Sequence, residues 1–208
     1  MIITDVAIDL DGVAYPFSKA FKKYCESVLG YTNLEEPTRW EFYEDWGMTK
    51  IEFMRHLKTA SKDHALFSTE EPMEGVKSAW KLFKAANITT HVVTARPHTA
   101  WASTADWLHK YAIVPDHLHF THDKTMISHV SKGACAAIDD YTVYYDELVK
   151  SGVFTVLHSQ PWNLSHIHAK RVDSLYQFAT ILYKLNCTKD KKWQKQNDKN
   201  CYKTPSTL

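Results

Sequence analysis

Residues 2–13 read IITDVAIDLDGV, a short apolar run that ends in two aspartates and a glycine. The length of the run and its apolar content are typical of a strand buried inside a sheet. Asp9 and Asp11 follow directly after this predicted strand. A strand that ends in acidic residues is therefore the first indication of the fold, and also the first candidate for a functional site.

Four further apolar runs of similar length follow, with helical periodicity between them. These runs are Ile88–Val93, His117–Phe120, Ala134–Ile138 and Val153–Leu157. The residues expected to share a buried helix face are Val76, Ala79, Trp80 and Phe83, then Trp101, Ala105 and Leu108, then Tyr144, Leu148 and Val149. Strands that alternate with helices predict an α/β fold with a doubly wound, parallel, five-stranded sheet.

Residues 17–72 interrupt this alternation with helical, aromatic-rich sequence. Thr49 and Glu52 have the spacing of a capping box that opens a helix. We expect residues 1–16 and 73–186 to form the core and residues 17–72 to form a small helical cap inserted after the first strand. The lysine-rich residues 187–208 are expected to be a basic, disordered tail.

Composition and charge limit the classes of partner. The 208 residues are 44% hydrophobic and 24% charged, with a formal net charge of +1, which is ordinary for a globular protein and argues against a nucleic-acid partner. No apolar stretch approaches the ~20 residues that span a bilayer, so no membrane partner is expected. The first residues lack the basic flank of a signal peptide, and the four cysteines lack CxxC spacing. A cytoplasmic protein fits these features best.

Polar residues occur at four points where predicted strands end. They are the stretch DLDGV after the first strand, VTAR after the second, Lys124 after the third, and Asp139 with Asp140 after the fourth. In an open α/β sheet, ligands bind at the edge formed by the carboxyl ends of the strands. The shared position of these residues predicts one site at that edge.

These residue types match the needs of phosphoryl transfer from an ester. A carboxylate can attack phosphorus and form an aspartyl-phosphate, which splits one difficult step into two easier ones. Its repulsion from the anionic phosphate must be neutralised, and Mg²⁺ and a lysine suit carboxylate and phosphate oxygens. Asp9, Asp11 and the pair Asp139–Asp140 supply carboxylates, Lys124 supplies a fixed cation, and Thr94 supplies a hydroxyl donor.

The motifs DLDGV, VVTAR, Lys124 and IDD, in that order, resemble those of the haloacid dehalogenase-type phosphatases over residues 2 to about 160. The resemblance implies that Asp9 is the nucleophile and that Asp11 is the general acid and base. It further implies that Thr94, Ala95 and Lys124 hold the phosphate. The implied metal ligands are Asp9, Asp11 and Asp140, and Asp139 would support Asp140 without binding the metal directly. Residue chemistry alone does not decide which of Asp139 and Asp140 is the direct ligand.

Within this superfamily, DGVAYPF and the later QPWN are similar to the 5′(3′)-deoxyribonucleotidases and their bacterial and phage relatives. This resemblance places Phe17 against a nucleobase. Of Trp40, Phe42, Tyr43 and Trp46, one or two are expected to reach the pocket, and Arg96 is a further candidate for substrate binding. The expected activity is magnesium-dependent hydrolysis of nucleoside monophosphates.

Several alternatives remain open at this point. The DLDG stretch alone could be a surface turn, and His117, His119 and His122 superficially resemble a zinc motif. The chain could instead remove 3′-phosphates from nucleic-acid ends, as polynucleotide kinase phosphatase domains do, or be a catalytically silent binding module on the same fold. A homodimer is also compatible with the sequence.

Overall fold

The computed structural model describes residues 2–63, 65–131 and 133–187. One parallel sheet of six strands runs through the core in the order β3-β2-β1-β4-β5-β6. The strands are β1 (Ile3–Ile8), β2 (Thr89–Thr94), β3 (His117–Phe120), β4 (Ala134–Asp139), β5 (Phe154–His158) and β6 (Arg171–Val172). The five predicted strands are confirmed. The predicted strand number is corrected to six, because the two residues of β6 are too short to give an apolar run.

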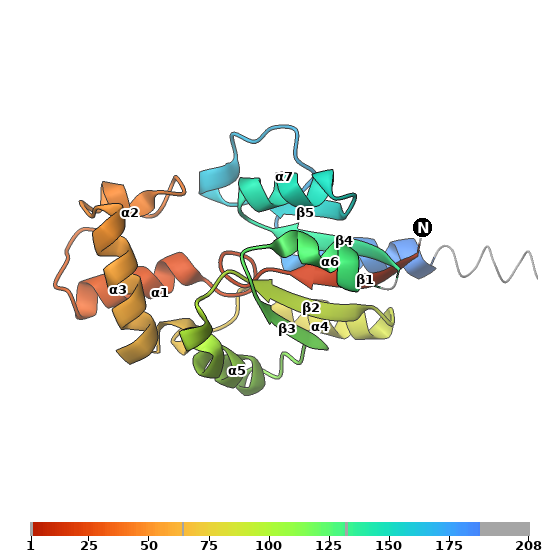
Figure 1. Ribbon diagram of the computed structural model, residues 1–208, viewed down its shortest axis with the longest axis horizontal. Helices are drawn as coiled ribbons and strands as arrows, with labels where there is room; N and C mark the ends of the chain where they lie inside the picture. Colours follow the sequence, from red (N-terminus) through yellow and green to blue (C-terminus); the bar gives the residue numbers. More distant parts are fainter. Residues whose placement is uncertain (1, 64, 132, 188–208) are drawn as a thin grey trace, which may run out of the picture.

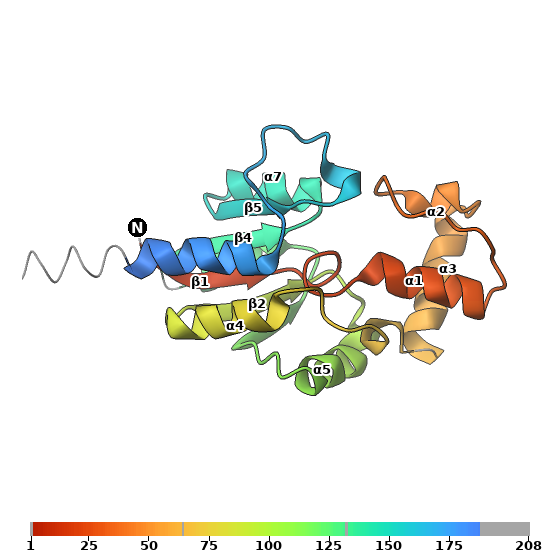
Figure 2. The same ribbon diagram turned by 180° about the vertical axis from the view of Figure 1, so that it is seen from behind.

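Helices cover both faces of the sheet, which confirms the doubly wound arrangement (Figures 1 and 2). The core helices are α4 (Val76–Ala85), α5 (Trp101–Lys110), α6 (Ile127–Val130), α7 (Thr142–Lys150) and a helix over residues 175–187. Successive strand side chains point to opposite faces. Ile8 therefore packs in the cluster that contains Phe178 of the last helix, whereas Ala7 packs in the cluster that contains Leu148 of α7.

The buried helix faces agree only partly with the periodicity. In α4 the buried residues are the predicted ones, Val76, Ala79, Trp80 and Phe83. In α5 the prediction holds for Leu108 and is wrong for Trp101, which is 56% exposed. Thr104 and Trp107 complete the buried face. In α7 the buried residues are Tyr145 and Leu148, and Val149 is exposed.

A group of helices lies apart from the sheet, beyond the ends of the strands (Figure 1). These helices are α1 (Phe17–Ser27), α2 (Phe42–Asp45), α3 (Lys50–Asp63) and the short η1 (Leu66–Ser68). The capping box before α3 is present: the Thr49 amide donates to Glu52 at 2.8 Å and the Glu52 amide donates to the Thr49 hydroxyl at 3.2 Å. We propose that residues 17–72 form the cap, and the name is used for them below.

The two chain segments that join the cap to the core are tied together. The Tyr15 hydroxyl donates to the Leu66 carbonyl, and the Met73 amide donates to the Ala14 carbonyl at 2.9 Å. A second contact lies at the other side of the cap, where the Trp40 ring stacks on Tyr141 with 4.0 Å between the ring centroids. The cap is therefore held to the core both at its base and over the end of β4.

The predicted basic tail, residues 187–208, lies outside the described residues apart from Cys187. Among the helices that the structure describes, none has the length and apolar character needed to cross a bilayer.

Candidate active site

The loop after β1 depends on Gly12. This residue has a φ of +81°, and a Cβ atom added there would lie 2.0 Å from Oδ2 of Asp140. A left-handed conformation and a close approach of this kind both favour glycine. The Gly12 carbonyl accepts hydrogen bonds from the Gln160 side chain at 2.6 Å and the His158 ring at 2.7 Å. These contacts fix the loop beside the end of β4.

Lys124 connects two carboxylates inside the site. It lies in η3 (Lys124–Met126), just after β3, and its side chain is only 5% exposed. The ammonium donates to Oδ1 of Asp9 and to Oδ2 of Asp139, each at 2.6 Å. The position of η3 is supported by Asp123, whose side chain caps it by accepting from the Thr125 amide.

The acidic trio of Asp9, Asp139 and Asp140 brings oxygen atoms within 4.8 Å of one another. Burial raises the pKa of Asp9 to about 7 although Lys124 opposes the shift, and the nearby Asp139 and Asp11 raise it further. Burial, with Asp9 next, also raises the pKa of Asp140 well above its ordinary value. Burial alone would lower the pKa of Lys124, but the Asp139 and Asp9 carboxylates raise it.

The trio fits a divalent cation. One lysine faces three buried carboxylates, so the site has an excess of negative charge that a metal would offset. Its ligands are carboxylate oxygens, which Mg²⁺ prefers. Within the described ranges this is the only group of three or more acidic, histidine or cysteine side chains close enough to share an ion.

Asp140 is held by the segment after β5. The Trp162 indole donates to Oδ2 of Asp140 at 3.1 Å, and the Asn163 side chain donates to the Asp140 carbonyl at 2.8 Å. Both residues belong to η4 (Pro161–Asn163). The QPWN stretch is visible in the sequence, but no spacing rule shows that its tryptophan reaches Asp140, just after β4.

The second motif lies where β2 ends. Thr94 is fully buried and its hydroxyl accepts from the Arg96 amide at 3.2 Å, and Ala95 is half-buried between them. The side chain of Arg96 does not line the cavity described below. It is 0% exposed and lies behind Asp11, with its Nη2 2.7 Å from Oδ1 and its Nε 2.9 Å from Oδ2. The structure therefore places Arg96 outside the lining of that cavity, and its predicted contact with substrate stays a prediction.

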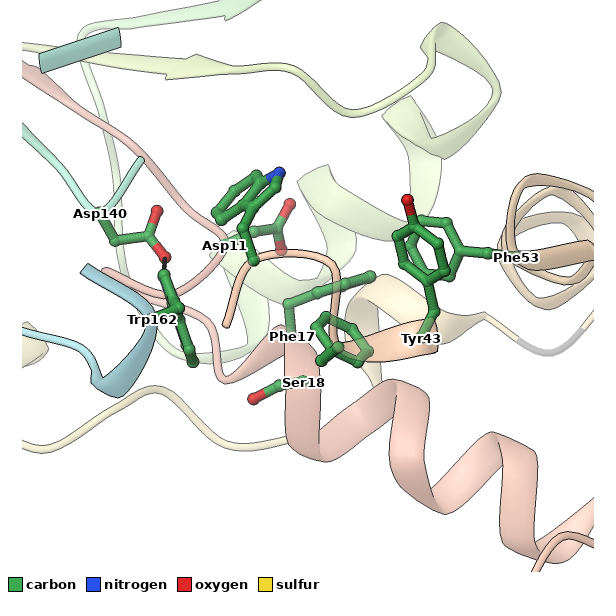
Figure 3. A pocket seen from close by; sticks show the side chains of 10 residues that line it. Asp11, Phe17, Ser18, Tyr43, Phe53, Asp140 and Trp162 are labelled. Atoms are coloured by element: carbon green, nitrogen blue, oxygen red, sulfur yellow. Dashed lines mark hydrogen bonds between the residues drawn. The ribbon is translucent and has the colours of Figure 1, made fainter. Parts of the chain in front are cut away.

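An aromatic cavity of about 120 Å³ lies between the cap and the core (Figure 3). Asp11 and Asp140 lie at its core side, and Phe17, Tyr43 and Phe53 reach it from the cap. It is lined by Asp11, Gly12, Phe17, Ser18, Trp40, Phe42, Tyr43, Phe53, Asp140 and Trp162. The expected Phe17, Trp40, Phe42 and Tyr43 are thus brought together beside the acidic residues.

Trp46 does not join them. Its ring stacks on Phe21 inside the cap and its indole donates to the Glu35 carbonyl at 3.0 Å. Trp46 is therefore not among the residues that line the cavity, and its predicted contact with substrate stays a prediction. Ser18, Phe53 and Trp162 also line the cavity and were not expected there from the sequence. Successive helix residues do not share a face, so the spacing of α1 does not place Ser18 beside Phe17, and Phe53 and Trp162 reach the cavity through tertiary packing.

The histidines form a separate network. His91 contacts His119 at 3.2 Å and Asp5 at 3.1 Å, and the rings of His91 and His117 stack. These contacts account for the histidine-rich stretch of β3 without a metal ligand set.

Comparison with protein families now identifies the chain. The model of the family described as 5′ nucleotidase, deoxy (pyrimidine), cytosolic type C matches residues 1–187. The chain belongs to this family. Membership makes it a phosphomonoester hydrolase and confirms the resemblance to the deoxyribonucleotidases. Among the curated proteins there is no significant match.

Solved structures agree with the family on the fold. A phosphonoacetaldehyde hydrolase-like protein from Oleispira antarctica has 13% identity and a TM-score of 0.62, covering 89% of this chain and 93% of its own. A haloacid dehalogenase-superfamily hydrolase from Geobacter sulfurreducens has 16% identity and a TM-score of 0.59, covering 86% and 96%. CbbY from Rhodobacter sphaeroides, solved with phosphate, has 14% identity and a TM-score of 0.57, covering 84% and 96%.

In this nucleotidase-family chain, the raised pKa values predict how metal binding depends on pH. Between the ordinary aspartate pKa of ~3.9 and the raised Asp9 value of about 7, the metal-free native state holds more protons than the unfolded state. Its free energy of unfolding should therefore fall as pH rises through that window. A cation that binds the ionised trio should offset this loss.

We expect the rise in Tm caused by Mg²⁺ to be larger near pH 8 than near pH 6. Differential scanning fluorimetry with and without Mg²⁺ measures it, and Asp140→Asn is the control, in which the rise should shrink. An equal rise at both pH values, or an undiminished one in Asp140→Asn, would contradict a metal site at the trio.

Proposed function

We propose that this protein is a magnesium-dependent phosphatase that releases phosphate from nucleoside monophosphates through an aspartyl-phosphate on Asp9. The observation that carries the proposal is the position of the aromatic cavity. It opens between the cap and Asp11, Gly12 and Asp140, beside the buried pair of Lys124 and Asp9. A planar base and a phosphate could therefore be bound at adjoining places.

The chain's own residues suit the two halves of the reaction. An oxygen of Asp9 attacks phosphorus, the bond from phosphorus to the nucleoside oxygen breaks, and Asp11 gives that oxygen a proton. Water then attacks the phosphorus of the aspartyl-phosphate and Asp11 takes the proton, while the bond to Asp9 breaks and its carboxylate is restored. Proton transfers of this kind contribute ~10²–10⁴-fold to a rate.

Lys124 and Thr94 are the proposed phosphate ligands in this scheme, with Ala95 beside them. The buried ammonium already neutralises Asp9 and lies where an anionic phosphate would approach it. Mg²⁺, held by Asp9, Asp140 and the Asp11 backbone carbonyl, would supply further charge neutralisation on the phosphate oxygens.

Asp139 and Asp140 take different roles in the proposal. Lys124 and the Tyr141 amide contact the two oxygens of Asp139. Asp140 is contacted through Oδ2 and reaches the cavity. This difference supports Asp140 as the direct metal ligand and Asp139 as the residue that holds Lys124.

The cavity lining supports a nucleobase as the remote group of the substrate. Tyr43 and Phe53 stack with 4.5 Å between centroids, and Phe17 lies across from Trp162 (Figure 3). Aromatic faces bind a base by stacking at ~1–3 kcal/mol, without reading its edge. We therefore propose a broad preference among bases.

Two alternatives are less well supported. A phosphatase for 3′ ends of nucleic acids needs room for a polymer, whereas the cap and the Trp40–Tyr141 stack lie over the site and the net charge is +1. A silent binding module would have no need of the complete set Asp9, Asp11, Thr94, Lys124 and Asp140.

The family's name refers to a cytosolic enzyme, which supports a cytoplasmic location.

The proposed function is tested by phosphate release from a panel of substrates. We expect deoxyribo- and ribonucleoside 5′- and 3′-monophosphates to be hydrolysed in Mg²⁺ and not in EDTA, and an oligonucleotide with a 3′-phosphate to be hydrolysed far more slowly. Faster release from the oligonucleotide would favour the nucleic-acid phosphatase. No release from any ester, with the metal-induced rise in Tm intact, would favour the binding module.

A variant of Phe17 tests the base position. In Phe17→Ala, kcat/KM for nucleotides should fall roughly tenfold to a hundredfold, because ~1–3 kcal/mol of stacking is lost. The rate with p-nitrophenyl phosphate should change little, because the phosphate still meets Asp9, Thr94 and Lys124.

Phe21→Ala is the matched control, since Phe21 lies one turn further along α1 and is fully buried inside the cap. It should lower Tm by creating a cavity, at ~3–5 kcal/mol, and change the two substrates alike. If Phe17→Ala behaved in the same way as Phe21→Ala, Phe17 would be a packing residue and the base site would lie elsewhere.

A further inference from the structure

Arg96 is buried at the candidate active site, and its side chain is 0% exposed. We propose that Arg96 is a positioning residue, which holds the Asp11 carboxylate in the orientation from which it takes a proton from the attacking water. The proposal rests on the proposed function and assigns a residue to its second half, the hydrolysis of the aspartyl-phosphate.

The contact between the two side chains is bidentate. Nη2 of Arg96 lies 2.7 Å from Oδ1 of Asp11, and Nε lies 2.9 Å from Oδ2. Two parallel N–H donors fix both the place and the plane of a carboxylate, which a single contact does not.

The guanidinium is itself held on several sides. Its carbon lies 4.8 Å from the centroid of the Tyr15 ring and 4.3 Å from that of Phe67. Nη1 donates to the Thr104 hydroxyl at 3.0 Å, from α5. These groups come from the β1 loop, the end of the cap and the core, and together they fix the position of the guanidinium. The guanidinium in turn fixes the orientation of the Asp11 carboxylate.

Asp11 needs such support because it is the more exposed partner. Its side chain is 26% exposed and lines the cavity, whereas the Arg96 side chain is 0% exposed. A carboxylate oxygen has about two lone-pair sites. With the guanidinium behind it, Asp11 keeps the remaining sites for the cavity side. Arg96 can therefore orient Asp11 without touching the substrate.

The kinetic consequence differs from that of lost substrate binding. Asp11 serves both halves of the proposed reaction, but p-nitrophenolate is a weak base that leaves without a proton. With p-nitrophenyl phosphate, poor orientation of Asp11 therefore slows only the hydrolysis of the aspartyl-phosphate. In Arg96→Gln, kcat for p-nitrophenyl phosphate should fall about tenfold to a hundredfold, and kcat for a nucleotide, whose alkoxide needs the proton of Asp11, should fall at least as far. With p-nitrophenyl phosphate, KM should fall in parallel, and the fraction of enzyme trapped as acid-stable phosphoenzyme should rise.

Arg96→Lys, which retains the charge but can make only one-point contacts, should give a smaller change in the same direction, and it replaces the Gln variant if that does not fold. Thr104→Val is the control, because it removes a partner of Arg96 without touching the carboxylate pair. It should lower Tm and raise the phosphoenzyme fraction far less than Arg96→Gln does, because the bidentate contact with Asp11 and the rings of Tyr15 and Phe67 still hold the guanidinium. In an Asp11→Asn background, Arg96→Gln should cause no further loss of kcat.

Three outcomes would overturn the proposal. They are a rise in KM with kcat unchanged, a loss of kcat without phosphoenzyme accumulation, and an undiminished loss in the Asp11→Asn background. The nucleotide panel with wild-type protein separates these outcomes from a failure of the proposed function, because that panel does not depend on Arg96.

Discussion

The ammonium of Lys124, 2.6 Å from both Asp9 and Asp139, is the interaction on which the rest of the site depends. Three carboxylates gathered in a buried place repel one another and lose hydration, which raises the pKa of Asp9 and Asp140. Removing the Lys124 ammonium would leave that charge uncompensated, a change that typically costs ~3–5 kcal/mol. The sheet provides the framework that permits the cluster, because β1 and β4 are neighbours and β3 leads directly into η3.

The loop beside this acidic cluster also links the cap to the core. Gly12 lets the loop pass against Asp140, and Trp162 holds that carboxylate from the other side. Tyr15, three residues after Gly12, ties the loop to the end of the cap and also faces Arg96. The groups proposed to move protons and those proposed to bind the base are thus joined through a few short contacts.

The strands of the core could be predicted from the sequence better than the side-chain contacts between the cap and the core. Strand ends could be located because buried parallel strands give short apolar runs, and Asp9, Thr94, Lys124 and Asp139 all lie at the expected edge. The buried face of α5 could not be predicted from the periodicity. Trp107 of α5 is buried in a tertiary contact, in which its indole donates to the carbonyl of Glu70, a residue of the cap. The positions of Trp46 and Arg96 could not be predicted for the same reason. Trp46 donates to the Glu35 carbonyl and Arg96 pairs with Asp11, and the sequence alone shows neither contact.

The proposed mechanism requires Asp9 to carry the phosphate between the two halves of the reaction. Rapid acid quenching during turnover, followed by mass spectrometry of the digested protein, would detect this intermediate. We expect a phosphate on the peptide that contains Asp9, absent from Asp9→Asn protein and lost when turnover is allowed to finish. Steady release of phosphate by the Asp9→Asn protein, or a phosphate trapped on another residue, would contradict it.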